Sequence, residues 1–404
     1  MGALEGMKVL DLTQYEAGTT STQYLANLGA TVYKVENPGI GDPGRGTEGP
    51  GKDSLYFLSF NHNKKSVAIA LNTPRGHELF LELVKRVNVV VENFSFHTME
   101  KLGLGYEVLK AANPGIIYCT IKGFGTSGPY KEFKSFDWVA QASGGAFSVT
   151  GEADGPPMRP GATVGDTGTG NHAAIGILAA YIEQQRTGKG QIVEISMQET
   201  VVNFMRTQIS YRERYDDGVV PRRGNRSVSP TSLYPCAPGG PNDYVWFMPA
   251  TTRMFDSLMT AIDLGHLAAD ERFSTPQARA RHGEELDAEI SKWTRTRTKF
   301  EVMEYIGPLG VPVGAVYDSH DIFNDRHLKE RGQIVTYEHP TRGQVQMPAP
   351  PVHLSSSDVP VIPAPLLGQH TAEVLAAELG LAPGELEQLA EQRVLGVPRT
   401  AVGV

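Results

Sequence analysis

The feature that most constrains the fold is the regular alternation of short apolar runs with helix-like runs along the first half of the chain. The apolar runs are typical of buried strands, and the segments between them have helical spacing and end at glycine or proline. Strand, helix and strand in that order predict parallel pairing through a right-handed crossover. The sequence therefore predicts a doubly wound α/β sheet, in which ligands bind beyond the carboxyl ends of the strands. We expect strands at residues 8–13, 31–36, 67–71, 87–91, 116–121 and 191–196.

The length of 404 residues allows more than one domain. We predict a large doubly wound domain over residues 1–225, a smaller α+β domain over 226–332, and a C-terminal segment over 333–404 that returns to the large domain. The stretch from Tyr211 to Pro230 is interpreted as a linker or binding loop. Arginines in and near it are either surface charges or ligands for a second carboxylate of a substrate: Arg206, Arg212, Arg222, Arg223, Arg226 and Arg253.

Composition narrows the classes of partner. The formal net charge of -8 disfavours broad attraction to nucleic acid. The two cysteines, Cys119 and Cys236, imply no disulfide framework and fit a reducing cytoplasm. No apolar run approaches the ~20 residues needed to cross a bilayer, and no signal peptide is recognised. We therefore expect a cytoplasmic protein without nucleic-acid or membrane partners.

Several common cofactor and catalytic motifs are absent from the sequence. No Gly-x-Gly-x-x-Gly follows the first strand, which disfavours a nicotinamide cofactor. A Gly-x-Ser-x-Gly elbow and a P-loop lysine motif are also missing, which disfavours a hydrolase of that type and a nucleotide triphosphatase. Histidine and cysteine do not fall at metal-binding spacing. We expect neither a metal nor a permanently bound cofactor.

The stretch Gly165–Gly170, of sequence Gly-Asp-Thr-Gly-Thr-Gly, precedes a helix-like run over residues 171–185. One interpretation is that Asp166 is a helix N-cap. The other is that Asp166 is a nucleophile, because the helix end would favour its ionised form and the glycines would let a substrate approach closely. The spacing alone does not decide between them.

Basic residues near predicted strand ends are candidates for binding an anionic ligand. Lys64 and Lys65 lie just before a strand, and Lys134 lies three residues before Asp137. Lysine binds phosphate as a point charge that needs little geometry. The alternative is that all three lysines are solvated surface residues.

A set of short motifs then falls in the order and spacing of one enzyme family. They are Val9–Thr13, Ala17–Gly18, Val35–Gly39, Asn63–Ser66, Val91–Phe94, Gln141–Gly145, Gly165–Asp166, Arg186–Gln191 and Leu367–Thr371. Together they resemble the class III CoA-transferases, whose relatives include the carnitine, formyl-CoA:oxalate and benzylsuccinate enzymes. The resemblance covers nearly the whole chain, and its specificity lies in the order of the motifs rather than in any one of them.

The resemblance implies a Rossmann-like large domain with a smaller domain, and an interlocked dimer. A homodimer is expected, with a heteromer as the alternative. The substrates implied are an acyl-CoA thioester and a carboxylic acid. Asp166 matches the family nucleophile. Positions that match substrate or CoA contacts are Glu16, Asn37, Lys64, Lys65, Asn93, Phe94, Lys101, Lys134 and Asp137.

The chemistry implied by the resemblance is transfer of CoA through an aspartyl mixed anhydride and an aspartyl-CoA thioester on Asp166. The chain has Glu16 and Asn37 where formyl-CoA:oxalate enzymes have glutamine and arginine, and it lacks their glycine-rich loop. These departures favour a larger acceptor acid, with succinyl-CoA as the expected donor. Two alternatives stay open. One is a 2-methylacyl-CoA racemase-type acid–base enzyme, although Phe136 replaces the histidine that the racemases use. The other is a non-catalytic subunit of a heteromeric transferase.

Overall fold

The computed structural model describes residues 2–49, 53–210, 218–225 and 227–396. Two compact units are present. The first comprises Met1–Ser148, Arg159–Val219 and Gly332–Val404, and the second comprises Val149–Met158 and Val220–Arg331.

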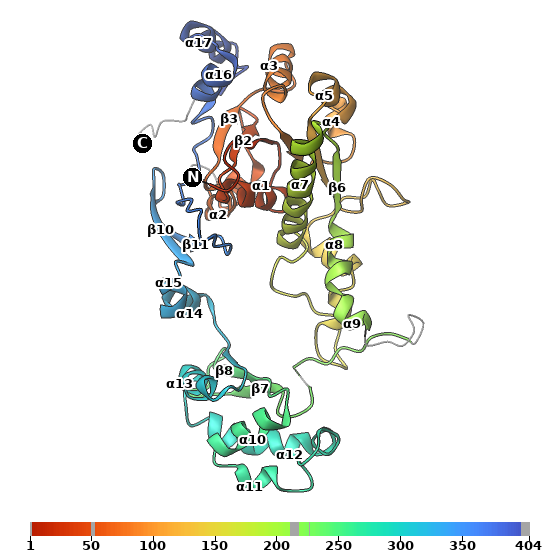
Figure 1. The fold of residues 1–404 in the computed structure, drawn as a ribbon, viewed down its shortest axis with the longest axis vertical. Helices are drawn as coiled ribbons and strands as arrows, with labels where there is room; N and C mark the ends of the chain where they lie inside the picture. The colour runs from red at the N-terminus through yellow and green to blue at the C-terminus, as the bar shows by residue number, and fades with distance from the viewer. Residues whose placement is uncertain (1, 50–52, 211–217, 226, 397–404) are drawn as a thin grey trace. The chain divides into compact units, whose positions relative to one another are not determined.

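The first unit is built on a parallel sheet of six strands in the order β3-β2-β1-β4-β5-β6. Figure 1 labels its two edge strands, β3 and β6. The strands are β1 (Lys8–Asp11), β2 (Thr31–Glu36), β3 (Lys65–Ala68), β4 (Val89–Glu92), β5 (Ile117–Lys122) and β6 (Ile192–Ser196). The strand order reverses between β1 and β4, which defines the switch point at which doubly wound sheets bind ligands. The predicted α/β doubly wound fold is therefore confirmed.

Helices cover both faces of this sheet. The helices of the unit are α1 (Ala17–Asn27), α2 (Leu55–Asn61), α3 (Pro74–Val84), α4 (Thr98–Lys101), α5 (Tyr106–Ala112), α6 (Asp137–Ser143), α7 (Thr167–Thr187), α8 (Met197–Phe204), α9 (Arg206–Ser210), α16 (Thr371–Leu379) and α17 (Pro383–Glu391), with short 3-10 turns at Pro43–Gly46 and Phe147–Val149. A hairpin of β10 (Ile334–His339) and β11 (Gly343–Pro348) completes the unit. Its residues Val345 and Met347 pack with Phe57 and Leu58 of α2.

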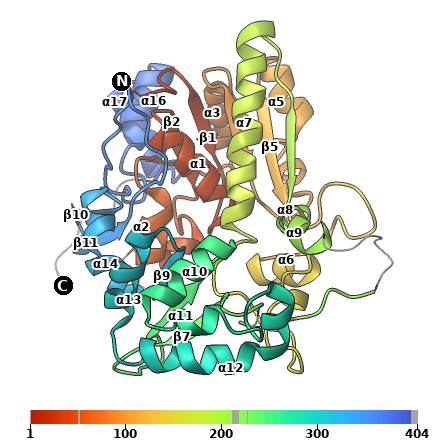
Figure 2. The ribbon, with the colours of Figure 1, turned by 60° about the horizontal axis from the view of Figure 1, so that its bottom comes forward.

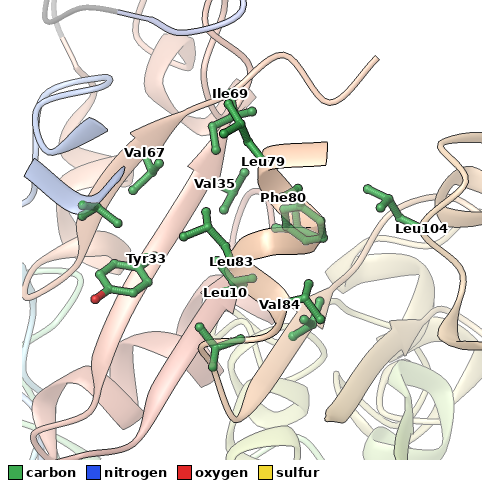
Figure 3. Close-up of a cluster of buried hydrophobic side chains, with 14 of the residues drawn as sticks. Leu10, Tyr33, Val35, Val67, Ile69, Leu79, Phe80, Leu83, Val84 and Leu104 are labelled. Atoms are coloured by element: carbon green, nitrogen blue, oxygen red, sulfur yellow. The ribbon is translucent and has the colours of Figure 1, made fainter. Parts of the chain in front are cut away.

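Alternating residues of each strand feed two separate cores, as expected for a sheet buried on both faces. Leu10 and Val35 face α3, where they pack with Leu79, Phe80 and Leu83 (Figure 3). The neighbouring strand residues face the other way. They join α1 and α7, which lie side by side on the opposite face (Figure 2). Because all six strands are parallel, their carboxyl ends lie together at one end of the sheet, between the two layers of helices.

The second unit is a smaller α+β fold, as predicted. Its antiparallel sheet has the order β7-β8-β9, with β7 at Ser232–Pro235, β8 at Tyr244–Phe247 and β9 at Val313–Ala315. Its helices are α10 (Thr252–Ala261), α11 (Gly265–Ala268), α12 (Pro276–Thr294), α13 (Lys299–Ile306), α14 (Ser319–Asn324) and α15 (Arg326–Glu330), with a 3-10 turn at Gly307–Leu309. Val245, Phe247, Phe255 and Leu286 lie in its core. Across the part of the chain that the structure describes, none of the helices has the length and apolar character to span a bilayer.

Candidate active site

A cavity of about 420 Å³ lies in the first unit beyond the carboxyl ends of β1, β4 and β5, at the switch point of the sheet. Asp166 reaches it from the start of α7. The residues that line it come from the segments that follow each strand: Gln14, Tyr15, Glu16, Ala17, Asn93, Phe94, Ser95, Phe96, His97, Thr98, Ile121, Lys122, Gly123, Lys131, Glu132, Phe133, Lys134, Ser135, Phe136 and Met197. The cavity therefore collects side chains that are far apart in the sequence.

Asp166 occupies the N-cap position of α7, but its side chain makes no capping hydrogen bond. Its backbone is already helical, with φ -86° and ψ -65°, whereas an aspartate that caps a helix has an extended backbone. Within the described residues no hydrogen bond to its carboxylate is found. The interpretation of Asp166 as a helix cap is therefore wrong, and its carboxylate is available for chemistry.

The turn that presents Asp166 is held by Asp137 at the start of α6. The Oδ1 atom of Asp137 accepts hydrogen bonds from the backbone N–H groups of Gly165 at 2.8 Å and Asp166 at 3.1 Å. Its Oδ2 atom accepts from Nε2 of Gln141 at 2.7 Å. Asp137 is buried and does not line the cavity, so the structure gives this predicted substrate-binding residue a supporting role.

Gly165 must be glycine for this turn to close. A Cβ atom there would lie 2.7 Å from the carbonyl oxygen of Asp137 and 2.9 Å from its Oδ1 atom. We expect Gly165→Ala to lower kcat for the CoA transfer that the sequence resemblance implies by roughly 10- to 100-fold, because a small misplacement of a reacting group is costly. Gly161→Ala is the matched control, since a Cβ at Gly161 meets no atom within 4 Å. Steady-state kinetics of both variants test this, and equal activity would contradict the assigned role of the turn.

The N-terminal ends of α1 and α7 meet, and this brings Glu16 close to Asp166. Gly170 of α7 allows the approach, because a Cβ there would lie 2.7 Å from the carbonyl oxygen of Ala17. Glu16, the residue before α1, accepts hydrogen bonds at its Oε1 atom from the hydroxyls of Thr163 at 2.5 Å and Thr167 at 2.7 Å. The carboxylate of Glu16 is thus tied to the start of α7 while it lines the cavity.

Tyr15 fixes the backbone on the other side of Glu16. Its φ of 59° is in the left-handed region, which is strained for an aromatic residue. Its N–H donates to Oδ1 of Asp42 at 3.2 Å, and Asp42 is paired with the buried Lys34 at 2.8 Å. The Tyr15 ring packs edge-on against Phe136, with ring centroids 5.9 Å apart. Both rings line the cavity, so one of its walls is aromatic.

The site is electrostatically unusual because three carboxylates are gathered in it. Burial, followed by the charges of Glu16 and Asp137, raises the pKa of Asp166 to about 8. Burial also raises the pKa of Glu16, while the hydroxyls of Thr163 and Thr167 act in the opposite direction. The expectation that the helix end keeps Asp166 ionised at neutral pH is therefore wrong. Burial beside two carboxylates outweighs the favourable field of α7.

Besides Glu16, three of the residues predicted to contact substrate or CoA line the cavity: Asn93, Phe94 and Lys134. The side chain of Asn93 holds the backbone of Gln14: its Oδ1 atom accepts from the N–H of Gln14 and its Nδ2 atom donates to the carbonyl of Gln14, each at 2.8 Å. Phe94 contributes to this cavity and to a second one of about 250 Å³ beyond β1, β2 and β3. Asn37 lines the second cavity, where its Oδ1 atom accepts from the N–H of Gly39 at 2.8 Å. Lys134 is exposed at the first cavity.

Lys134 contributes an exposed positive charge to the lining of the cavity, and the sequence resemblance predicts that it contacts CoA. We expect Lys134→Ala to raise KM for an acyl-CoA by roughly 3- to 10-fold at low salt, with less effect at high salt, because exposed charges are screened. Lys189→Ala is the control: Lys189 is also exposed, but it lies before the amino end of β6, away from the cavity. Kinetics at two salt concentrations test this. An unchanged KM would remove Lys134 from the binding surface.

The remaining predicted lysines do not line either cavity. Lys64 is buried, and its Nζ atom donates to Asp11, Thr19 and Asn61 at 2.9 Å each. This placement gives Lys64 a structural role in place of the predicted phosphate contact. Lys65 is on the surface and pairs with Glu373 at 2.6 Å. Lys101 is exposed at the end of α4.

The sequence prediction missed several residues that line the cavity. They are Gln14, Phe96, His97, Lys131 and Phe133. Each follows the carboxyl end of β1, β4 or β5, so the position of ligand sites in doubly wound sheets was the available signal. Of the arginines considered as carboxylate ligands, Arg212 and Arg226 lie outside the described residues. Arg222 donates to the carbonyl of Gly155 at 2.7 Å within the second unit.

Comparison with known proteins agrees with this fold. A family model described as CoA-transferase family III matches residues 4–371. A formyl-CoA:oxalate CoA-transferase from Streptomyces avermitilis is 41% identical over 409 residues, covering 97% of this chain and 99% of that protein. Another from Bradyrhizobium sp. (strain ORS 278) is 37% identical and covers 98% of each chain. Among solved structures, a CAIB/BAIF family protein from Brucella suis matches with a TM-score of 0.83 at 32% identity, covering 93% of this chain and 99% of that one.

The fold and these relatives define a CoA-transferase enzyme. The chain belongs to CoA-transferase family III. The family membership implied by the ordered sequence motifs is thus confirmed, and with it the transferase class.

Proposed function

We propose that this protein moves CoA from an acyl-CoA thioester to a carboxylic acid through covalent intermediates on Asp166. The observation that carries the proposal is the carboxylate of Asp166 in the cavity at the sheet switch point, without a hydrogen bond from the described residues. A carboxylate acceptor is a poor electrophile, so a covalent relay divides the transfer into steps with accessible barriers.

The proposed steps balance without an external reactant. The ionised Asp166 attacks the thioester carbonyl, the C–S bond breaks, and a mixed anhydride forms as CoA leaves as thiolate. The thiolate attacks the aspartyl carbonyl, the anhydride C–O bond breaks, and the donor acid leaves as carboxylate. The resulting aspartyl-CoA thioester is attacked by the acceptor acid, and the same two steps in reverse release the new acyl-CoA and free Asp166.

Each attack places negative charge on a carbonyl oxygen, which calls for hydrogen-bond donors in the site. The N–H groups of Gly165 and Asp166 are committed to Asp137. The N–H groups of Gly144 and Gly145 donate to backbone carbonyls of α6. Gln14 lines the cavity, and a glutamine side-chain amide is a donor of the required type.

The proposal extends to the identities of the donor acyl-CoA and the acceptor acid. The relatives named above point to formyl-CoA and oxalate as the first pair to try. The departures at Glu16 and Asn37 support the second pair, a succinyl-CoA donor with a larger acceptor acid. The homodimer is also part of the proposal, and light scattering of the purified protein tests it.

The test is an incubation of the purified chain with formyl-, acetyl- or succinyl-CoA and a panel of carboxylic acids, followed by mass spectrometry of new CoA thioesters. Appearance of a new thioester supports the proposal. If none appears with any pair, the proposal fails for the chain alone. Activity that appears only after another subunit is added would favour the heteromer. Deuterium incorporation from heavy water beside the thioester would favour the racemase-type alternative, for which Phe136 supplies no acid or base.

A further inference from the structure

Two aromatic rings in the cavity that holds Asp166 take no part in the transfer steps. Tyr15 and Phe136 both line this cavity, and their rings pack edge to face at 88°, with centroids 5.9 Å apart. Phe136 is 62% exposed and Tyr15 is 37% exposed. Rings that stay this open contribute little to folding, because an aromatic side chain stabilises a fold mainly by being buried.

The local backbone does not account for either ring. Phe136 is the N-cap residue of α6, yet its side chain has no atom that can cap a helix, whereas serine, threonine, aspartate or asparagine would stabilise this position. Tyr15 has a φ of 59°, a left-handed conformation that is unfavourable for an aromatic residue. Strain of this kind is typical of functional sites. Each ring therefore occupies a position where another residue type would stabilise the fold more.

The two rings are carried by the same two segments that hold Asp166 in place. Tyr15 directly precedes Glu16, whose carboxylate is hydrogen-bonded to the start of α7 at 2.7 Å. Phe136 directly precedes Asp137, whose Oδ1 atom accepts from the N–H of Asp166 at 3.1 Å. Neighbouring Cα atoms of a chain are only ~3.8 Å apart. The rings therefore form a wall of the cavity close to Asp166.

This wall is ordered before any ligand binds. The N–H of Tyr15 donates to Oδ1 of Asp42 at 3.2 Å, and its carbonyl accepts from Oγ1 of Thr19 at 2.5 Å. The carbonyl of Phe136 accepts from the N–H of Ala140 at 3.0 Å in the first turn of α6. A surface that is already ordered loses little conformational entropy when a ligand packs against it.

The lining of the cavity suits an apolar group. Besides the two rings, its apolar lining residues are Ala17, Phe94, Phe96, Ile121, Phe133 and Met197. An acid that reacts at Asp166 uses its carboxylate in the reaction, so the cavity can distinguish acids by the remaining part of the molecule. The side chains available for that contact are largely apolar and aromatic.

We propose that Tyr15 and Phe136 are specificity-determining residues that favour acceptor acids with a flat aromatic group. The carboxylate of such an acid attacks the aspartyl-CoA thioester on Asp166, and its ring packs against the pair in the edge-to-face or offset arrangement that aromatic rings prefer. The proposal rests on the proposed function and narrows its larger acceptor acid to one that bears an aryl group. The wall adds affinity for a ring without repelling a carboxylate, so it is compatible with a succinyl-CoA donor.

The test compares phenylacetate with cyclohexylacetate as competing acceptors for CoA from formyl-, acetyl- or succinyl-CoA, whichever donor the wild type uses best. The two acids have the same chain length and similar bulk, and a methylene group separates each carboxylate from its ring. They differ in the flatness and the electron distribution of the ring. The ratio of their kcat/KM values is the readout. We expect the wild type to favour phenylacetate by about fivefold, the order expected for one aromatic pair.

Phe136→Leu removes the ring and keeps an apolar side chain, so it should reduce this ratio to about one. Phe136→Tyr retains a ring and should keep the wild-type ratio. Trp138→Leu is the matched control, because Trp138 is also an exposed aromatic residue at the start of α6 but does not line the cavity. It should leave the ratio at the wild-type value. The ratio cancels any change that affects both acids, such as a shift of α6.

A wild type that does not favour phenylacetate overturns the proposal, and so does a Phe136→Leu ratio equal to that of the wild type or a Trp138→Leu ratio that falls as far. If Phe136→Leu keeps the ratio but dissociates a dimer in light scattering, a second copy covers the ring and the proposal is wrong. The wild-type ratio decides by itself if Phe136→Leu does not fold. Transfer to other acids but to neither of these two overturns this proposal alone, whereas absence of transfer to all acids overturns the proposed function as well.

Discussion

Asp166→Asn is expected to reduce CoA transfer by roughly 10³-fold or more, because the covalent relay has no other nucleophile and removal of a nucleophile typically has effects of this size. Asparagine keeps the shape of the side chain, and the N–H groups of Gly165 and Asp166 would still donate to Asp137. The loss should therefore appear in kcat with little change in the affinity for CoA. Steady-state kinetics and calorimetric titration with CoA measure the two quantities.

The same variant should be at least as stable as the wild type. The pKa of Asp166 is raised to about 8 in the folded protein, so the folded state keeps a proton that the unfolded state loses at lower pH. The contribution of the Asp166 carboxyl group to stability therefore declines as the pH rises from the pKa of this group in the unfolded chain to about 8, and it is fully lost above pH 8. Asparagine cannot ionise, so Asp166→Asn should raise Tm relative to the wild type near pH 8 and less so at acidic pH.

A true helix cap behaves in the opposite way, which supplies the control. Thr73 caps α3, where its hydroxyl accepts from the N–H of Gly76 at 3.1 Å. Thr73→Ala should cost about 1 kcal/mol of stability and leave transfer intact. If Asp166→Asn lowered Tm and spared transfer in the same manner, Asp166 would be structural and the proposed mechanism would fall.

Transfer should rise steeply with pH. Only the ionised Asp166 can attack, and with a pKa of about 8 the carboxylate is a minor species at neutral pH in the free enzyme. The ionised fraction grows roughly tenfold for each pH unit below that pKa, so kcat/KM should increase by about 50- to 100-fold from about pH 6 to about pH 9. The plateau should begin near pH 8 to 9, provided that binding of CoA does not change over the range.

The physical cause of this profile is also testable. Glu16 and Asp137 are the charges that raise the pKa of Asp166 after burial. Glu16→Gln should therefore move the midpoint of the kcat/KM profile to lower pH. Glu107→Gln, at an exposed residue of α5 outside the cavity, makes the same charge change and should leave the midpoint unchanged. A profile that is flat from about pH 6 to about pH 9 in the wild type would mean that Asp166 is ionised throughout, contrary to its assigned environment.

Local pattern was enough to predict the sheet. The strand at β1 and the strand at β4 are recognisable because buried parallel strands are continuous apolar runs. The sequence order of the motifs singled out Asp166 among many acidic residues as the proposed nucleophile. Both signals are read along the sequence, so neither needs knowledge of tertiary contacts.

Local sequence patterns do not predict the surroundings of the site, because these depend on packing between segments that are distant in the sequence. A lysine before a strand gives the same sequence pattern whether its side chain is in solvent or, as with Lys64, is bonded to a buried aspartate. The ionisation of Asp166 was misjudged because Glu16 and Asp137 approach it only through the packing of α1, α6 and α7. Gly170 and Gly165 are the sequence features that allow this close packing. A glycine in a sequence does not identify the segment that packs against it.

The most direct test of the central claim is to trap the intermediate on Asp166. Hydroxylamine added during turnover with an acyl-CoA should convert the aspartyl thioester or anhydride to a hydroxamate. We predict that peptide mass spectrometry will find this adduct at Asp166, only when acyl-CoA is present, and not in Asp166→Asn. Sustained transfer with no adduct, or with the adduct on another residue, would contradict the proposal that Asp166 carries the CoA.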